Sequence, residues 1–163
     1  MDNDNQDFQK KLNKNKNVVL VGGCFDLLHY GHIIFLKEAK KLGDRLIVLL
    51  ESDENVRRLK GEGRPFHTQA QRKEMLEMVS VVDEVIPLPP ISGNDKYLQI
   101  VNGIHPSIIA MTDGERILKH RIKQAKLVGA EPVIIPKIPT PSTSQLAKLL
   151  GLELNNAMNS LPI

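Results

Sequence analysis

The chain has 163 residues, with 22 Lys and Arg against 19 Asp and Glu, and a formal net charge of +3. This length suits one domain with its own hydrophobic core, and the lone Cys24 excludes an internal disulfide, which favours a reducing, cytoplasmic location. The longest apolar run, residues 46–50, is too short to span a membrane, so no membrane partner is expected. The mild positive charge suits a small anionic ligand. The sequence has no basic cluster with interleaved aromatic residues, so a nucleic-acid partner is not expected.

The sequence predicts one folded domain between two short ends. Asp, Asn, Gln and Lys fill fourteen of the first seventeen residues. Such a stretch buries too little apolar surface to offset its chain entropy, so residues 1–17 are predicted to be a mobile polar arm. Residues 18–151 form the predicted domain, and residues 152–163 are expected to form a C-terminal tail.

From Val18 onward, short β-rich runs alternate with longer helical patterns. Apolar runs without polar alternation predict strands covered on both faces, at residues 18–22, 45–51, 83–88, 107–111 and 132–135. Helices are predicted between them: one that ends near Gly43, one opened by the capping box of Thr68 and Gln71, and three at residues 94–102, 115–128 and 142–150. This alternation predicts the α/β class, as a single Rossmann-like, doubly wound domain with a five-stranded parallel sheet.

The first predicted strand runs directly into the segment with the strongest functional signal. Gly22 and Gly23 let the backbone approach a ligand closely, and the helix that follows offers its N-terminus to a phosphate. His29 and His32 are three residues apart at that helix start, so both can face one anion, and Gly31 leaves room for it. A structural interpretation has one histidine capping a turn and the other in the core, but two histidines in a glycine-bearing turn favour function. A zinc site is a third interpretation, weakened because the sequence offers no nearby third ligand.

A series of short blocks extends this signal along the chain, at residues 23–26, 29–32, 42–48, 58–61, 64–65, 71–72, 82–85 and 142–144. In this order and spacing they resemble the nucleotidyltransferase family with the HxGH signature, in its cytidylyltransferase-like branch. The blocks cover nearly the whole predicted domain. Within the family, the chain is most similar to heptose 1-phosphate adenylyltransferase domains and to glycerol-3-phosphate cytidylyltransferases.

The resemblance implies transfer of a nucleoside monophosphate from ATP or CTP to a small phosphorylated acceptor, a sugar phosphate or a polyol phosphate, with release of pyrophosphate. It implies Mg²⁺ carried by the nucleotide phosphates, no metal site on the chain itself, and a homodimer. Catalytic roles are implied for His29, His32 and Lys60. The nucleotide-binding residues implied are Gly22, Gly23, Cys24, Phe25, Gly31, His32, Asp113, Lys137, Ser142, Thr143 and Ser144. The substrate-binding residues implied are Asp26, Lys60, Arg64 and Arg72.

Several of these residues also have a structural interpretation. Lys60 and Arg64 follow the second strand on a predicted loop, where a solvated basic turn is the alternative to a contact with the acceptor phosphate. Residues 142–144 open the last helix, where their hydroxyls either cap the helix or seat the β- and γ-phosphates. Asp26 either lies near the acceptor or holds a turn, and Arg72 either contacts anions or holds a helix in place.

The chain departs from the family pattern in two places, which keeps other functions open. Residues 111–114 read Met-Thr-Asp-Gly where the family has glycine, then glycine or asparagine, then aspartate, and Pro141 replaces an aliphatic residue. A nucleotide-binding regulatory module without turnover is therefore the alternative function, and an RNA-binding domain is a third. Neither departure removes a charge-stabilising group, so the sequence favours the enzyme and leaves the base and the acceptor open.

Overall fold

The computed structural model describes residues 17–91, 93–114 and 117–152, so almost all of the predicted arm and tail lies outside the described residues. Five parallel strands form one sheet in the order β3-β2-β1-β4-β5. Their bounds are Val18–Gly23 for β1, Arg45–Leu50 for β2, Glu84–Pro87 for β3, Ile108–Thr112 for β4 and Glu131–Ile135 for β5. The predicted α/β class, with a five-stranded parallel and Rossmann-like sheet, is confirmed.

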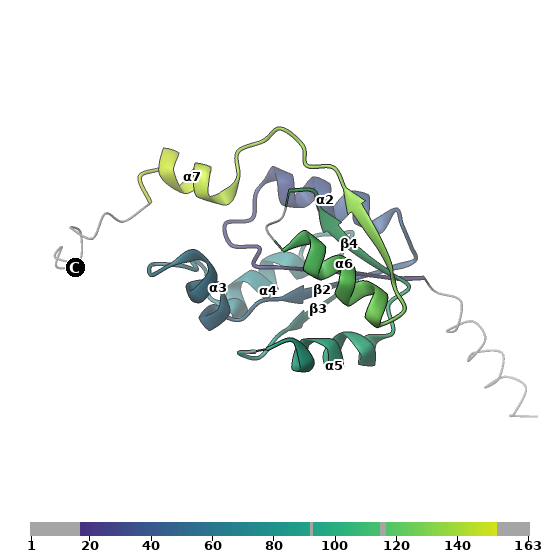
Figure 1. The fold of residues 1–163 in the computed structure, drawn as a ribbon. Helices are drawn as coiled ribbons and strands as arrows, with labels where there is room; N and C mark the ends of the chain where they lie inside the picture. Colours follow the sequence, from purple (N-terminus) through teal and green to yellow (C-terminus); the bar gives the residue numbers. More distant parts are fainter. Residues whose placement is uncertain (1–16, 92, 115–116, 153–163) are drawn as a thin grey trace, which may run out of the picture.

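Helices cover both faces of the sheet, with α2 and α4 on one face and α5 and α6 on the other (Figure 1). The helices are α2 (Tyr30–Lys40), α3 (Asp53–Lys60), α4 (Gln69–Glu77), α5 (Asn94–Ile104), α6 (Leu118–Leu127) and α7 (Thr143–Leu149). None of these described helices is long and apolar enough to cross a membrane.

The central strand is buried on both faces, which explains its uninterrupted apolar sequence. In β1, Val19 and Val21 pack in the core cluster that includes α2 and α4, whereas Leu20 packs in the cluster that includes α5 and α6. All three side chains are at most 1% exposed. Strands sandwiched between two helical layers lose the polar alternation of a half-exposed sheet, as the sequence indicates.

The stretch after β2 corrects one prediction. It is a helix, α3, and Lys60 is the last residue of that helix rather than part of a loop. Ser52 caps α3, since its hydroxyl accepts a hydrogen bond from the backbone N–H of Asn55 at 3.2 Å. The helix therefore fixes the position of Lys60 relative to the sheet.

Two further helix boundaries differ from the predicted ones. The helix that precedes β2 ends at Lys40, with Lys41 as its C-cap, and not near Gly43. Gly43 instead packs so closely against the carbonyl oxygen of Asn17 that a Cβ would not fit. Helix α6 begins at Leu118, and residues 115 and 116, part of its predicted first turn, lie outside the described residues. The capping box that opens α4 is confirmed.

The carboxyl ends of β1 and β4 part from each other and leave a crevice in the sheet. β1 pairs with β2 along its whole length but with β4 only at Val19 and Leu20. The strand order also reverses here, because the chain runs outward from β1 in both directions. Open α/β sheets bind ligands at such a switch point. The fold therefore places a site beyond Gly22 and Gly23.

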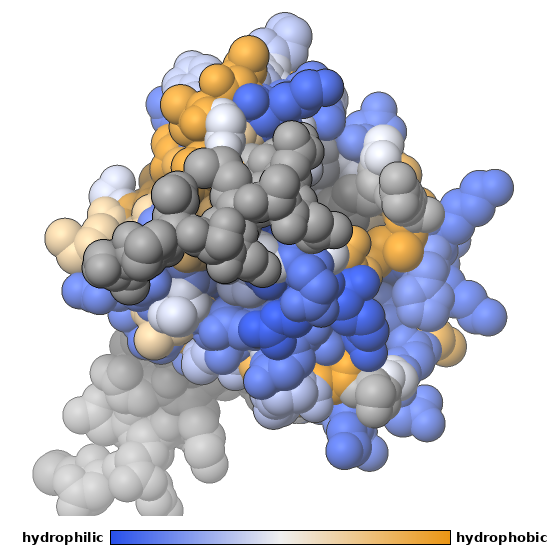
Figure 2. Space-filling model, turned by 90° about the vertical axis from the view of Figure 1, so that its left-hand side faces the viewer, coloured by the Kyte–Doolittle hydropathy of each residue, from blue (hydrophilic) through white to orange (hydrophobic). Residues whose placement is uncertain are grey.

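Helix α7 extends away from the sheet and approaches the rest of the domain with its first turn (Figure 1). Thr143 and Ala147 are its buried residues, whereas Leu149 and Leu150 are exposed. On the side of the molecule where α3 and α7 lie, an apolar strip at the upper left borders a largely hydrophilic surface (Figure 2). The buried end of α7 is the end that the sequence places near the phosphates.

Candidate active site

The loop between β1 and α2 is held in place by the buried carboxylate of one of its own residues, Asp26. Asp26 is 1% exposed. Its carboxylate accepts hydrogen bonds from Nε of Arg64 at 2.7 Å and from the backbone N–H groups of Phe66 at 2.9 Å and His67 at 3.3 Å. These bonds hold the loop in a sparsely populated conformation, in which Phe25 has a φ of 46°. Asp26 and Arg64 thus hold the loop, and neither lines the cavities described below.

Arg72 joins three segments beneath the site. Its side chain is fully buried and donates hydrogen bonds to the backbone carbonyl oxygens of Cys24, Glu51 and His67. It also forms a 2.8 Å ion pair with the carboxylate of Asp53. A buried guanidinium whose donors are satisfied in this way fixes the position of its partners. Arg72 therefore ties the ends of β1 and β2 together and, like Asp26, lies outside both cavities.

His29 and His32 form the start of α2 and stack on each other. Their ring centroids are 3.8 Å apart, with an angle of 26° between the ring planes. Nδ1 of His29 accepts the backbone N–H of Gly31 at 3.1 Å, and Nδ1 of His32 accepts the backbone N–H of His29 at 3.3 Å. A neutral imidazole whose Nδ1 accepts carries its proton on Nε2. Each ring therefore caps the helix with one nitrogen and keeps an N–H donor at the other.

Burial keeps both rings in the neutral form. It lowers the pKa of His32 to about 3, with repulsion from His29 and Lys60 acting in the same direction. Burial also lowers the pKa of His29, again aided by Lys60 and by Lys137. The ring of Phe25, 5.2 Å from that of His32 between centroids, supplies part of this apolar environment. The pair can therefore donate hydrogen bonds to an anion near neutral pH without first gaining protons.

The lowered pKa of His32 predicts that stability depends on pH. The unfolded chain protonates this histidine near pH 6.5, whereas the folded chain keeps it neutral down to about pH 3. Because the unfolded state binds the extra proton, stability is greatest above pH 6.5 and falls as the pH falls. Between pH 7 and pH 5, the free energy of unfolding should fall by about 2 kcal/mol more in the wild-type chain than in His32→Gln, measured by urea unfolding. An equal fall in both would contradict a buried, neutral His32.

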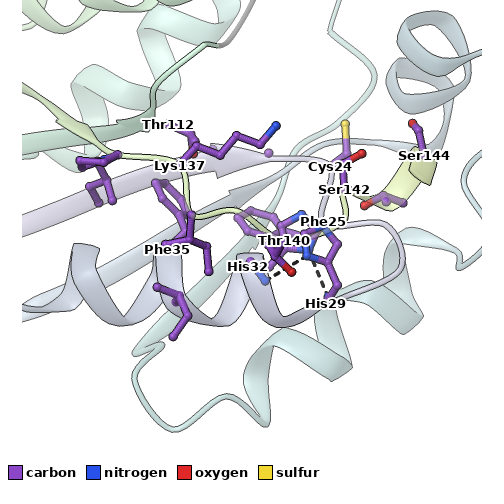
Figure 3. A pocket seen from close by; sticks show the side chains of 18 of the residues that line it. Cys24, Phe25, His29, His32, Phe35, Thr112, Lys137, Thr140, Ser142 and Ser144 are labelled. Carbon is purple, nitrogen blue, oxygen red and sulfur yellow. Dashed lines mark hydrogen bonds between the residues drawn. The ribbon is translucent and has the colours of Figure 1, made fainter. Parts of the chain in front are cut away.

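The first cavity, of about 420 Å³, opens beyond the end of β1 at the crevice. Most of the nucleotide-binding residues implied by the resemblance line it (Figure 3), namely Gly22, Gly23, Cys24, Phe25, Gly31, His32, Lys137, Ser142, Thr143 and Ser144. His29 and Lys60 line it as well, but Asp113 does not. Asp113 lies on an exposed turn after β4, and its neighbour Thr112 faces the cavity instead. Among the described residues that line this cavity none is acidic, so its charge suits an anion.

Three residues at the start of α7 line the same cavity, and Ser142 and Ser144 are drawn beside it in Figure 3. Ser142 is the N-cap, and its hydroxyl accepts the backbone N–H of Gln145 at 3.3 Å. Thr143 is buried, and its hydroxyl donates to the backbone carbonyl oxygen of Asp26 at 2.9 Å. This bond ties α7 to the loop that carries the histidines. Ser144 is exposed and lines the cavity, which places its hydroxyl within reach of a ligand.

Gly31 lets α2 approach the segment between β5 and α7. A Cβ at this position would lie 2.8 Å from Cγ2 of Thr140 and 3.0 Å from Cε1 of His29. Both distances are shorter than ordinary contacts of a Cβ, so any larger residue would displace the histidine or the opposite wall. Gly31 therefore sets the width of the first cavity beside His29.

A second cavity, of about 320 Å³, lies on the other side of the end of β1, between α3, α5 and α6. Its described lining carries the basic side chains of Arg58, His120 and Arg121, the acidic side chain of Glu51, and the amides of Asn55, Asn94 and Gln124. Arg121 lines both cavities, and its Nη1 and Nη2 each donate to the carbonyl oxygen of Gly22 at 3.3 Å. Sequence reasoning missed Arg121 because it lies 99 residues from Gly22 and its helix carries no motif.

Cys24 lies where the two cavities meet, since it lines both. Burial raises the pKa of its thiol, with the charge of Lys60 acting in the opposite direction. A thiol that stays protonated near neutral pH is a poor nucleophile. Cys24 is therefore a small residue of the cavity wall.

Within residues 17–91, 93–114 and 117–152, no group of three or more His, Cys, Asp and Glu side chains is arranged to hold a metal ion. Mg²⁺ prefers oxygen ligands and keeps several waters when it binds a nucleotide. The described lining of the first cavity offers hydroxyl groups such as that of Ser144 and no carboxylate, so it suits a Mg²⁺ ion that the phosphates of a nucleotide would carry.

The parallel sheet, the crevice at its switch point and the paired histidines together define an α/β domain that binds an anionic ligand. The chain belongs to the cytidylyltransferase-like family, whose family model matches residues 20–145. The resemblance on which the expected site residues rest is thereby confirmed.

Similar proteins are known from archaea and bacteria. FAD synthase from Thermococcus sibiricus is 37% identical over 141 residues, which span 84% of this chain and 92% of that protein. Bifunctional protein HldE from Campylobacter jejuni is 41% identical over 114 residues, 63% of this chain but only 24% of that protein. The crystal structure of the lipopolysaccharide core biosynthesis protein from Thermoplasma volcanium has a TM-score of 0.61 and 28% identity, and the match covers 77% of this chain and 99% of that chain. The chain thus spans about a quarter of HldE.

Proposed function

We propose that the chain is a nucleotidyltransferase that moves a nucleoside monophosphate from ATP or CTP to a small phosphorylated acceptor and releases pyrophosphate. The observation that carries the proposal is the first cavity, where two neutral histidines, Lys60, Lys137 and Ser144 converge. Membership of the cytidylyltransferase-like family and the similarity to an FAD synthase support the same class of reaction.

The two ends of the first cavity suit the two ends of a nucleotide. The triphosphate lies along His29, His32 and Ser144, where the side chains donate hydrogen bonds. The ring of Phe35 lies on the side of the cavity away from Ser144 (Figure 3), and this apolar side accepts the base and the ribose. Lys60 and Lys137 offset the negative charge of the phosphates.

In the reaction, an oxygen of the acceptor phosphate attacks the α-phosphorus of the nucleotide. A new phosphorus–oxygen bond forms, the bond from the α-phosphorus to the oxygen that bridges to the β-phosphate breaks, and its electron pair leaves with pyrophosphate. Nε2–H of His29 and of His32 donate to oxygens that gain charge in the transition state. The chain positions two anions and forms no covalent bond itself. Mg²⁺ bound to the triphosphate would neutralise part of the charge on the leaving group.

The second cavity is the proposed acceptor site. It borders the first cavity at the end of β1, and Arg58 and His120 give it basic side chains that suit a phosphate. Its amides, among them those of Asn94 and Gln124, which hydrogen-bond to each other, can also bind the hydroxyl groups of a sugar or polyol. The chemistry of the lining does not select one acceptor, so the class remains small phosphorylated molecules.

Release of pyrophosphate tests the proposed function. The purified chain is incubated with Mg²⁺ and either ATP or CTP, together with glycerol 3-phosphate, hexose 1-phosphates, heptose 1-phosphates and flavin mononucleotide as acceptors. We expect that only one of the two nucleotides yields pyrophosphate, and only when a matching acceptor is present. Tight nucleotide binding without pyrophosphate release from any pair of nucleotide and acceptor would instead support the regulatory module. The position of Asp113, exposed and outside the first cavity, favours that alternative.

Lys60→Ala is expected to weaken triphosphate binding, because Lys60 lines the first cavity and not the second. This place favours a contact with the triphosphate over the contact with the acceptor phosphate that the resemblance implies. Loss of one charge-assisted hydrogen bond should raise the Kd of a nonhydrolysable triphosphate about tenfold, measured by isothermal titration. Arg57→Ala, an exposed change on the same helix that lines neither cavity, is the matched control. An unchanged Kd for the triphosphate with a raised KM for the acceptor would show that Lys60 contacts the acceptor phosphate instead.

A further inference from the structure

Glu51 is the only carboxylate that the described residues contribute to the two cavities, and it lines the second one. It directly follows the last residue of β2, and its backbone is held through both of its polar groups. The N–H donates to the carbonyl oxygen of Gly23 at 3.1 Å, and the carbonyl oxygen accepts from Nη2 of Arg72 at 2.9 Å. Because Gly23 lines both cavities, Glu51 lies beside the boundary between them.

A chain of hydrogen bonds also fixes the side chain of Glu51. Its Oε2 accepts from Nδ2 of Asn55 at 2.9 Å, and Oδ1 of Asn55 accepts from Nη2 of Arg58 at 3.1 Å. All three residues line the second cavity. Within the described part of the chain, Oε1 of Glu51 has no hydrogen-bond partner. Since an ionised carboxylate can only accept hydrogen bonds, this oxygen suits a ligand that brings a donor.

A carboxylate beside the boundary works against a phosphate that approaches it. Burial raises the pKa of the Cys24 thiol and the charge of Glu51 adds to the rise, so this charge reaches the residue at which the cavities meet. Like charges repel more strongly in a site shielded from water than in bulk water. A phosphate has little to offer Glu51, because its oxygens are themselves acceptors. A hydroxyl group on the acceptor donates to the carboxylate and brings no charge of its own.

An ammonium group on the acceptor would also bind a carboxylate, but the second cavity favours a neutral donor. Asn55 joins Glu51 to the guanidinium of Arg58, which offsets the negative charge and repels a second cation. The amides of Asn94 and Gln124 in the same lining suit hydroxyl groups as well. The surroundings of Glu51 therefore match a polyhydroxylated acceptor.

We propose that Glu51 is a specificity-determining residue, which accepts a hydrogen bond from a hydroxyl group on the carbon next to the one that carries the acceptor phosphate. The inference rests on the proposed function and deepens it, because it narrows the acceptors to phosphates with a neighbouring hydroxyl group. Sugar 1-phosphates, glycerol 3-phosphate and flavin mononucleotide all have this group. The hydroxyl group orients the acceptor, and an oxygen of the phosphate remains the attacking atom.

The test compares the acceptor that works best in the pyrophosphate assay with its analogue that lacks this hydroxyl group. The analogue is a 2-deoxyhexose 1-phosphate for a hexose 1-phosphate, and propane-1,3-diol monophosphate for glycerol 3-phosphate. The wild-type chain should prefer the complete acceptor at least about tenfold in kcat/KM, the effect of one hydrogen bond to a charged group. Glu51→Ala should lose this preference, and Glu51→Gln should keep part of it through its neutral oxygen.

Glu62→Gln, an exposed change that lines neither cavity, is the matched control and should keep the full preference. The Kd of a nonhydrolysable triphosphate should be the same in all four proteins, because Glu51 does not line the first cavity. A loss of triphosphate binding in Glu51→Gln would place Glu51 on the nucleotide side and overturn the inference.

A structural role for Glu51 predicts a different pattern. If the carboxylate only holds Asn55 in α3, Glu51→Ala would lower the melting temperature and lower kcat/KM equally for both acceptors, so an unchanged preference would overturn the inference. Equal use of both acceptors by the wild-type chain would overturn it too, as would a higher kcat/KM with ethanolamine phosphate than with ethylene glycol monophosphate. Should Glu51→Ala fail to fold, the full preference in Glu51→Gln would be the contradicting result. If the wild-type chain releases no pyrophosphate with any acceptor, the proposed function fails first and the inference fails with it.

Discussion

His32→Ala is expected to lower kcat about 100-fold or more, the loss found when one donor to transition-state charge is removed. His32 lines the first cavity, its neutral ring keeps an N–H at Nε2, and its ring stacks on that of His29. Because the donor acts mainly on charge that develops during the reaction, the Kd of the triphosphate should change much less than kcat.

The same substitution also removes the Nδ1 acceptor for the backbone N–H of His29, so a small loss of stability is expected. A capping side chain contributes about 1 kcal/mol, too little to unfold the domain. His105→Asn, an exposed change at the end of α5 that lines neither cavity, is the matched control, and asparagine tolerates the positive φ there. If His32→Ala turned over at the rate of this control, His32 would not be a catalytic residue.

Arg72→Met is expected to lower the free energy of unfolding by about 3 kcal/mol or more. The substitution keeps most of the volume of the side chain but leaves the carbonyl oxygens of Cys24 and Glu51 and the carboxylate of Asp53 without their donor. Buried acceptors without a partner bear the full cost of desolvation. Urea unfolding followed by circular dichroism measures the change.

Arg57→Met is the matched control for this experiment, because Arg57 is exposed and lines neither cavity. It should unfold at the same urea concentration as the wild-type chain. A stable Arg72→Met protein with a raised KM for the acceptor would show that Arg72 binds the substrate, as the resemblance implies, instead of holding the loops together.

The sheet could be predicted from the sequence because its strands are buried on both faces and therefore read as apolar runs. The helix α3 could not be predicted in the same way. Val56 and Leu59 are its only apolar residues and Leu59 is exposed, so the helix has no apolar run that a strand-like or core-facing pattern would reveal. Its signal was one of charge and capping: Ser52 at the N-cap, acidic residues in the first turn, basic residues in the last and Gly61 after it.

The proposed nucleotide side of the site follows from local sequence, because the glycines, His29 and His32 lie within one turn between a strand and a helix. Contacts between distant segments do not follow from it. A motif cannot tell whether Asp26 meets a substrate or the guanidinium of Arg64, since both uses need the same charge. Arg121 lines the site only because α6 packs against β4 and β5, from where its side chain reaches the carbonyl oxygen of Gly22 at the end of β1.

The fate of the α-phosphate tests the central claim most directly. The purified chain, Mg²⁺ and the acceptor that supports pyrophosphate release are incubated with nucleotide labelled at either the α- or the γ-phosphate, and the products are separated. Attack on the α-phosphorus predicts that the α-label appears in the acceptor product, joined through a new diphosphate bond, while the γ-label appears only in pyrophosphate. A γ-label in the acceptor product, or an α-label found only in nucleotide that is not joined to the acceptor, would contradict nucleotidyl transfer.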